Sequence, residues 1–192
     1  MAEPTPEELF NLGMLSYDKQ DFSKARKYFE KACELKDGGG CGALGDLYDD
    51  GKGVEKNSKK AAQFYSKACD LNNGRGCNNL GVLYEYGQGV EKDLIKAAYF
   101  YSKACDLNIG DGCKNLGVLY TTGRGVEKDS TKAAYLYSRA CELKDGWGCS
   151  FLGVLYYNGD GVKQDSKKAV ALFEKACKLG YKKACEMLKE LR

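Results

Sequence analysis

The chain has 192 residues, a net charge of +3 and no histidine. Acidic and basic residues are mixed along it, and no block of Lys or Arg predicts a nucleic-acid surface or an anionic membrane patch. Its longest apolar runs are about five residues, far short of the roughly 20 that a membrane-spanning helix needs. We therefore expect no nucleic-acid partner and no insertion into a membrane.

Ten cysteines form the most regular feature of the sequence. They fall in five pairs, the members of each pair are eight residues apart, and each pair follows the previous one by 36 residues. Such a period predicts a tandem array of similar units. The pairs are Cys33 and Cys41, Cys69 and Cys77, Cys105 and Cys113, Cys141 and Cys149, and Cys177 and Cys185.

The first unit, residues 5–36, differs from those that follow. Leu12-Gly13, Ala25, Phe29 and Ala32 mark two amphipathic helices. Gly13 lies 12 residues before Ala25, whereas the corresponding Gly45 lies 16 residues before Ala61. The two helices of the first unit are therefore expected to be joined by a short turn.

Four longer units follow at 37–72, 73–108, 109–144 and 145–180. In 73–108, Cys77, Leu80, Gly81 and Tyr84 have the spacing of one helix face, and Ala97, Ala98, Tyr101, Ala104 and Cys105 mark a second helix. Gly87 and Gly89 predict positive φ angles where the first helix stops. Helix N-caps are expected at Asn57, Asp93, Asp129 and Asp165.

The last segment, residues 181–192, is long enough for one amphipathic helix that carries Ala184, Met187, Leu188 and Leu191. It is expected to cap the last unit, because the terminal unit of an array must cover its own apolar face.

Each cysteine pair brackets a chain reversal, for example Asp37-Gly-Gly-Gly40 between Cys33 and Cys41. On one continuous helix, residues eight apart would lie about 12 Å from each other, too far for a disulfide. A reversal brings them together, so we expect Cys33–Cys41, Cys69–Cys77, Cys105–Cys113, Cys141–Cys149 and Cys177–Cys185. Zinc sites favour closer cysteines, often with histidine, so we expect no metal and no other cofactor.

Five disulfides imply an oxidising compartment, so a secreted or periplasmic location is expected. The opening residues Met-Ala-Glu-Pro-Thr-Pro have neither a basic nor an apolar region typical of a signal peptide. Either an export signal is missing from this sequence or its start has been replaced.

The motifs Leu-Gly-x-Leu-Tyr, Gly-x-Gly-Val and Lys-Ala-x-x-x-Tyr-x-Lys-Ala resemble the Sel1-like repeat. The first unit resembles a tetratricopeptide repeat, and the cysteine pairs narrow the resemblance to the Helicobacter cysteine-rich proteins. The resemblance covers essentially the whole chain. It implies an all-α fold, a right-handed α/α superhelix with one disulfide per repeat, and export from the cell. It also implies penicillin binding with weak β-lactamase activity.

Motifs for catalysis are weak. Gly-x-Gly recurs four times without a preceding strand, so loop geometry explains it better than a phosphate site. Ser16-Tyr-Asp-Lys19 matches the Ser-x-x-Lys of serine β-lactamases, but neither Ser-Asp-Asn nor Lys-Thr-Gly accompanies it. We therefore assign no catalytic residue.

In tetratricopeptide-like arrays, the first helix of each unit lines the concave face. The expected function is peptide or protein binding by a monomer in that groove, because side-chain amides can donate to and accept from an extended chain. A weak penicillin-binding hydrolase and an engineered array without a natural ligand are the alternatives. The peptide-binding residues expected are Asn78, Asn79, Val82, Glu85, Lys114, Asn115, Val118, Ser150 and Tyr157, and Asp46, Asp49, Thr121 and Val154 share the same face.

Overall fold

The computed structural model describes residues 2–191, and within them every regular element is an α-helix. The all-α repeat architecture expected from the sequence is thereby confirmed. The chain divides into two units, one ending at Phe100 and the other beginning at Tyr101, and α6 (Leu94–Asp106) contains the boundary. Each unit is described by itself.

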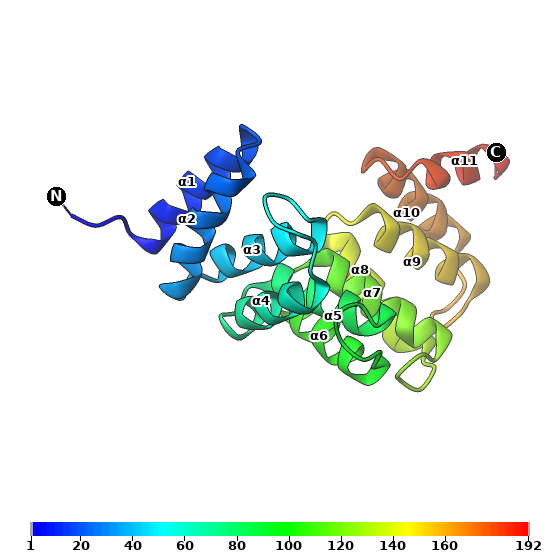
Figure 1. Cartoon of the computed structure of the whole chain (residues 1–192). Helices are drawn as coiled ribbons and strands as arrows, with labels where there is room; N and C mark the ends of the chain where they lie inside the picture. Colours follow the sequence, from blue (N-terminus) through cyan, green and yellow to red (C-terminus); the bar gives the residue numbers. More distant parts are fainter. Residues whose placement is uncertain (1, 192) are drawn as a thin grey trace. The chain divides into compact units, whose positions relative to one another are not determined.

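The first unit consists of helical hairpins (Figure 1). Helix α1 packs against α2, and α3 packs against α4. The first helices of successive hairpins are also neighbours, because α3 contacts both α1 and α5. Their bounds are α1 Pro6–Asp18, α2 Phe22–Glu34, α3 Gly38–Asp50, α4 Ser58–Asp70 and α5 Gly74–Tyr86.

The second unit repeats this arrangement. Helix α7 pairs with α8, α9 pairs with α10, and α7 also contacts α9 (Figure 1). The bounds are α7 Gly110–Thr122, α8 Ser130–Glu142, α9 Gly146–Asn158, α10 Ser166–Lys178 and α11 Lys182–Glu190.

The predicted helix ends are confirmed. The side chain of Asn57 accepts a hydrogen bond from the Lys60 amide at 3.0 Å, and Asp93, Asp129 and Asp165 cap their helices in the same way. Gly87 and Gly89 have φ angles of +68° and +69°. The left-handed conformation that only glycine adopts without steric cost therefore ends the first helix of the longer repeats.

Within a hairpin, a ring from the second helix lies directly on a glycine of the first. A Cβ atom added to Gly45 would lie 2.6 Å from the Tyr65 ring, and one added to Gly117 would lie 2.6 Å from the Tyr137 ring. The rings fill the centre of each repeat and are almost fully buried. The rings that lie on such a glycine are Phe29, Tyr65, Tyr137 and Phe173.

All five expected disulfides are present, and they use all ten cysteines. Each joins the end of one second helix to the start of the next first helix across a Cα–Cα distance of 4.5–4.9 Å. Because every cysteine sulfur is bonded to another cysteine, the structure offers no thiolate to a zinc ion.

Helix α11 takes the place of a first helix in the repeat pattern. Cys185 and Leu188 of α11 correspond to Cys149 and Leu152 of α9, so Lys189 stands where α9 has Gly153. Gly153 accommodates the Phe173 ring of α10, whereas Lys189 is exposed.

None of the helices within residues 2–191 combines the length and the apolar composition that crossing a membrane requires.

Reduction of the disulfides should lower the melting temperature by a large amount while most helicity remains at low temperature. Each bridge closes a short loop, which the chain-entropy model equates with about 2–3 kcal/mol. Circular dichroism melts with and without a phosphine reductant measure the effect. An identical melting temperature after complete reduction, verified by thiol titration, would contradict the prediction.

Gly117→Ala should destabilise the second unit, although alanine favours an isolated helix over glycine by about 1 kcal/mol. The reason is the overlap of the new methyl group with the Tyr137 ring. Gly110→Ala is the matched control, because its Cβ would meet its nearest neighbours at 3.4 Å. Thermal unfolding should show a fall for Gly117→Ala alone. Equal effects of the two substitutions would show that the ring contact does not limit the site.

Candidate binding site on the first helices

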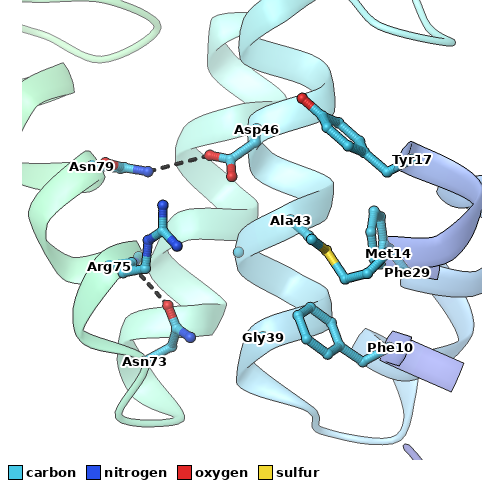
Figure 2. A pocket seen from close by; sticks show the side chains of 12 residues that line it. Phe10, Met14, Tyr17, Phe29, Gly39, Ala43, Asp46, Asn73, Arg75 and Asn79 are labelled. Carbon is cyan, nitrogen blue, oxygen red and sulfur yellow. Dashed lines mark hydrogen bonds between the residues drawn. The ribbon is translucent and has the colours of Figure 1, made fainter. Parts of the chain in front are cut away.

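The first unit contains a hollow of about 270 Å³ on its first helices. In Figure 2, Phe10 and Met14 extend from α1 toward α3, and Arg75 and Asn79 come from α5 on the opposite side. We call this hollow the α1–α3–α5 cavity. Its lining residues are Phe10, Met14, Tyr17, Phe29, Gly39, Gly42, Ala43, Asp46, Asn73, Arg75, Gly76 and Asn79.

The cavity exists because α3 carries small residues where other repeats carry larger ones. Gly39 corresponds to Arg75, Asp111 and Trp147, and Ala43 corresponds to Asn79, Asn115 and Phe151. In the second unit, Trp147 and Phe151 pack edge to face at 5.7 Å. Glycine and alanine leave this part of α3 without side chains of comparable size.

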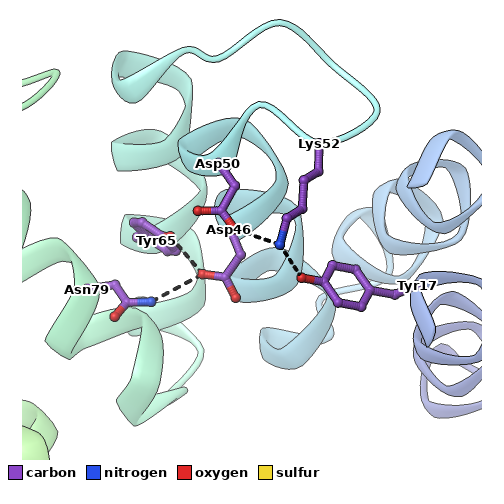
Figure 3. Close-up of polar contacts among 6 residues, drawn as sticks. All are labelled: Tyr17, Asp46, Asp50, Lys52, Tyr65 and Asn79. Atoms are coloured by element: carbon purple, nitrogen blue, oxygen red, sulfur yellow. Dashed lines mark hydrogen bonds and ion pairs between the residues drawn. The ribbon is translucent and has the colours of Figure 1, made fainter. Parts of the chain in front are cut away.

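Asp46 is the polar centre of the cavity (Figure 3). Its Oδ1 atom accepts a hydrogen bond from the Tyr65 hydroxyl at 2.7 Å and one from Asn79 Nδ2 at 3.3 Å. The corresponding residues of the later repeats are Val82, Val118 and Val154. A carboxylate therefore replaces a valine in α3 alone among these four helices.

Burial raises the pKa of Asp46, and the Tyr65 hydrogen bond and the charge of Arg75 oppose that rise. Two further carboxylates, Asp49 and Asp50, add to it. Burial and the negative charge of Asp46 in turn raise the pKa of Tyr65, so its hydroxyl keeps its proton and remains a donor.

A lysine bridges α1 and α3 beside the cavity (Figure 3). Lys52 Nζ donates to the Tyr17 hydroxyl at 2.8 Å and pairs with Asp50 Oδ2 at 3.2 Å. The same ammonium lies 5.2 Å from the Tyr17 ring centroid. These contacts hold the Tyr17 side chain at the edge of the cavity.

A second hollow, of about 340 Å³, lies in the second unit. It is mainly apolar, and Met187 of α11 and Leu191 after it form part of its lining. Val154 and Tyr157, both expected on the groove face, line it together with Asn158, Phe173 and Glu190.

The expected binding residues differ in their accessibility. Asn79 lines the cavity, and Tyr157 is 45% exposed. Three others are largely covered, with exposed fractions of 9% for Asn78, 7% for Glu85 and 2% for Ser150. These three side chains face packed surroundings and offer little surface to a ligand in this structure.

Lys114 is engaged within the second unit. Its Nζ lies 2.8 Å from Asp111 Oδ1, 3.8 Å from Asp145 Oδ2 and 5.4 Å from the centre of the Trp147 ring. Val118 is partly buried and packs against the core of that unit. Val82 and Asn115 are also partly buried.

The sequence interpretation missed the α1 side of the cavity. Phe10, Met14 and Tyr17 belong to the shorter first repeat, which does not align by the 36-residue period. The sequence nevertheless contained a signal for the cavity. Small residues at Gly39, Gly42 and Ala43 occur together with Asp46, an acid at a position where the later repeats have valine.

Ser16 does not have the setting of a nucleophile. It is 7% exposed, and its hydroxyl donates to the Leu12 carbonyl within α1 at 2.9 Å. That bond is the ordinary way for a serine inside a helix to satisfy its hydroxyl.

Models of two repeat families match the chain. The Sel1 repeat model matches residues 40–73, 74–109, 110–145 and 148–181. The chain belongs to the Sel1 repeat family. The tetratricopeptide repeat model matches residues 6–38, in agreement with the shorter turn of the first hairpin.

Related proteins support the same assignment. Helicobacter pylori cysteine rich protein B is 45% identical, with a TM-score of 0.56 over 68% of this chain and 93% of its own. A Sel1 repeat protein from Oxalobacter formigenes is 30% identical, with a TM-score of 0.87 over 94% of this chain and 74% of its own. The resemblance to Helicobacter cysteine-rich proteins is thereby confirmed.

A relative whose name describes an enzyme is matched over a shorter stretch. Beta-lactamase HcpA of Helicobacter pylori (strain J99 / ATCC 700824) is 58% identical over 59 residues, which are 31% of this chain and 24% of HcpA. The chain thus spans about a quarter of that protein's length.

Asp46→Asn should stabilise the protein at neutral pH, and the gain should disappear in acid. Because the pKa of Asp46 is raised in the folded protein, the ionised carboxylate lowers the stability of the fold at pH values above that pKa. Below the unfolded-state pKa of about 3.9, the group is protonated in both the folded and the unfolded protein, and this loss of stability is absent. Urea unfolding of both proteins between pH 3 and pH 8 measures the difference.

The exposed loop carboxylate Glu91 supplies the control, and Glu91→Gln should show no comparable pH-dependent gain. Arg75, Asp49 and Asp50 are kept unchanged, because their charges act on Asp46. A loss of stability for Asp46→Asn at pH 7 would show that its hydrogen bonds outweigh the cost of its burial.

Proposed function

We propose that this chain is an extracytoplasmic, disulfide-locked scaffold that binds a peptide or protein segment on its first helices. The α1–α3–α5 cavity is the observation that carries the proposal. It combines an apolar wall, Phe10 and Met14, with the polar groups of Asp46, Arg75 and Asn79. A peptide requires both kinds of surface, because apolar side chains alternate with backbone donors and acceptors.

The size of the cavity favours part of a chain over a small molecule. Sites that enclose drug-sized ligands typically have volumes of about 300–1,000 Å³, whereas this cavity has about 270 Å³. It fits one or two side chains of a longer ligand whose remainder runs over neighbouring helices.

Side-chain amides supply the backbone contacts in this proposal. Asn79 lines the cavity, and Asn115 occupies the same place one repeat later. An amide can donate to a backbone carbonyl and accept from a backbone N–H. Repeats of this kind commonly present such groups along an extended binding surface.

Location outside the cytoplasm is supported by the five disulfides and by the Helicobacter cysteine-rich relatives. Structural disulfides persist in oxidising compartments and are rare where thiols are kept reduced. A scaffold locked at every junction between hairpins suits such an environment.

A penicillin-binding hydrolase is the alternative suggested by the name of HcpA. The Ser16 motif does not support it, because the hydroxyl is covered and bonded to its own helix. We therefore propose binding rather than hydrolysis as the function of this chain.

Asn79→Ala and Asn115→Ala should each weaken peptide binding by about 5- to 100-fold, because an unpaired polar partner costs about 1–3 kcal/mol. An array of capped octapeptides identifies a binder, and calorimetry measures its affinity for each variant. Both variants should fold normally, since α3 has an alanine, Ala43, at this position.

Gln63→Ala is the matched control, because it removes the same amide group from an exposed position on α4. Its affinity should equal that of the unchanged protein. Equal losses in all three variants, or binding that neither asparagine affects, would place the binding surface elsewhere.

A further inference from the structure

We infer that the α1–α3–α5 cavity selects a cationic peptide segment, with a Lys or Arg side chain on Asp46 and an adjacent apolar side chain against Phe10 and Met14. The inference rests on the proposed function and names the chemistry of its ligand. Three independent features of the cavity support it.

The first feature is the position of the charge. Asp46 replaces the valine that the later repeats have in Val82, Val118 and Val154. The protein core does not require an acid there, because three repeats fold with an apolar residue at the same place. Burial disfavours the ionised carboxylate of Asp46, and packing does not require an acid at this position. Residues of this kind are typical of binding sites.

The second feature is the orientation of the carboxylate. Tyr65 and Asn79 both donate to Oδ1 and hold the side chain in one position (Figure 3). This arrangement leaves Oδ2 to accept a bond from a ligand. A carboxylate held by two donors loses little further freedom on binding, so an ammonium or guanidinium partner gains a strong charge-assisted bond.

The third feature is the balance of charge around the cavity. Helix α3 carries Asp46, Asp49 and Asp50 and no basic residue. Lys52 follows α3, but Tyr17 and Asp50 already engage its ammonium group. The charge of Arg75 from α5 acts on Asp46 more strongly than that of Asp50 or of Asp49, and these two carboxylates oppose it with negative charge beside the cavity.

Arg75 has a separate place in this arrangement. It is exposed on α5 and reaches the cavity from the side opposite to Phe10 and Met14 (Figure 2). A guanidinium group has only donors, so it can donate to a backbone carbonyl of a bound peptide. The cavity thus offers Asp46 to the cation, Arg75 to the backbone and the two α1 side chains to the apolar residue.

Three capped octapeptides test the inference. Each has alanine throughout except for a central pair, which is Leu-Lys, Leu-norleucine or Leu-Glu. We expect the lysine peptide to bind at least 10-fold more tightly than the norleucine peptide and the glutamate peptide to bind most weakly. Calorimetry at low and high salt should show that only the lysine peptide weakens strongly with added salt.

Two variants assign the effect to this cavity. Asp46→Val introduces the residue of the later repeats and should remove the preference for lysine. Ala43→Phe introduces the residue found at Phe151 and should fill the cavity, so that all three peptides bind at least 10-fold more weakly. Circular dichroism verifies that both variants fold.

The outcomes separate this inference from the proposed function. If the three peptides bind equally and Asp46→Val changes nothing, while Asn79→Ala weakens all of them, the groove binds peptides but the charge selection is wrong. If no capped peptide from the three or from the array binds, the proposed function fails together with the inference. Retention of the lysine preference in Asp46→Val would overturn the inference alone.

Discussion

The structure depends on a tight junction between successive hairpins. At four of the five junctions, a glycine just before the second cysteine of a pair lies against the alanine that precedes the first cysteine, whereas Ala184 takes the place of this glycine at the last junction. Added Cβ atoms at Gly40, Gly76 and Gly112 would each lie 2.6 Å from such an alanine methyl group. At these four junctions the two cysteine Cα atoms lie 4.5–4.6 Å apart, within reach of a disulfide.

Because these contacts are local, one repeat constrains mainly its immediate neighbour. Local contacts lower the entropy cost of loop closure during folding, and covalent links between neighbouring hairpins preserve their register afterwards. The surface residues of the first helices are consequently free to vary. Gly39, Arg75, Asp111 and Trp147 occupy one equivalent position with four different chemistries.

That freedom explains how one repeat acquires a cavity. Removal of side chains from α3 creates the space, and Asp46 adds a charge that the framework does not need. A carboxylate at a solvent-facing position costs the fold little stability. Burial disfavours the ionised form of Asp46 and so raises its pKa. The framework tolerates this cost because the core rings, such as Phe29 and Tyr65, and the junction disulfides remain in place.

The sequence by itself determined the repeat units, the helix caps, the loop glycines and the five disulfides. Each of these follows from residues close together in the chain, such as the Lys60 amide and its cap Asn57, so spacing alone predicts it.

Tertiary structure decided which first-helix side chains are accessible. Asn78, Glu85 and Ser150 share a predicted face with Asn79, yet packing covers these three. The cavity brings Phe10, Asp46 and Arg75 together from three helices, and α1 lacks the 36-residue register of the others. The burial of Asp46 and its hydrogen bonds depend on side-chain rotamers and on how helices far apart in the sequence pack together. The periodicity of a sequence encodes neither the rotamers nor this packing.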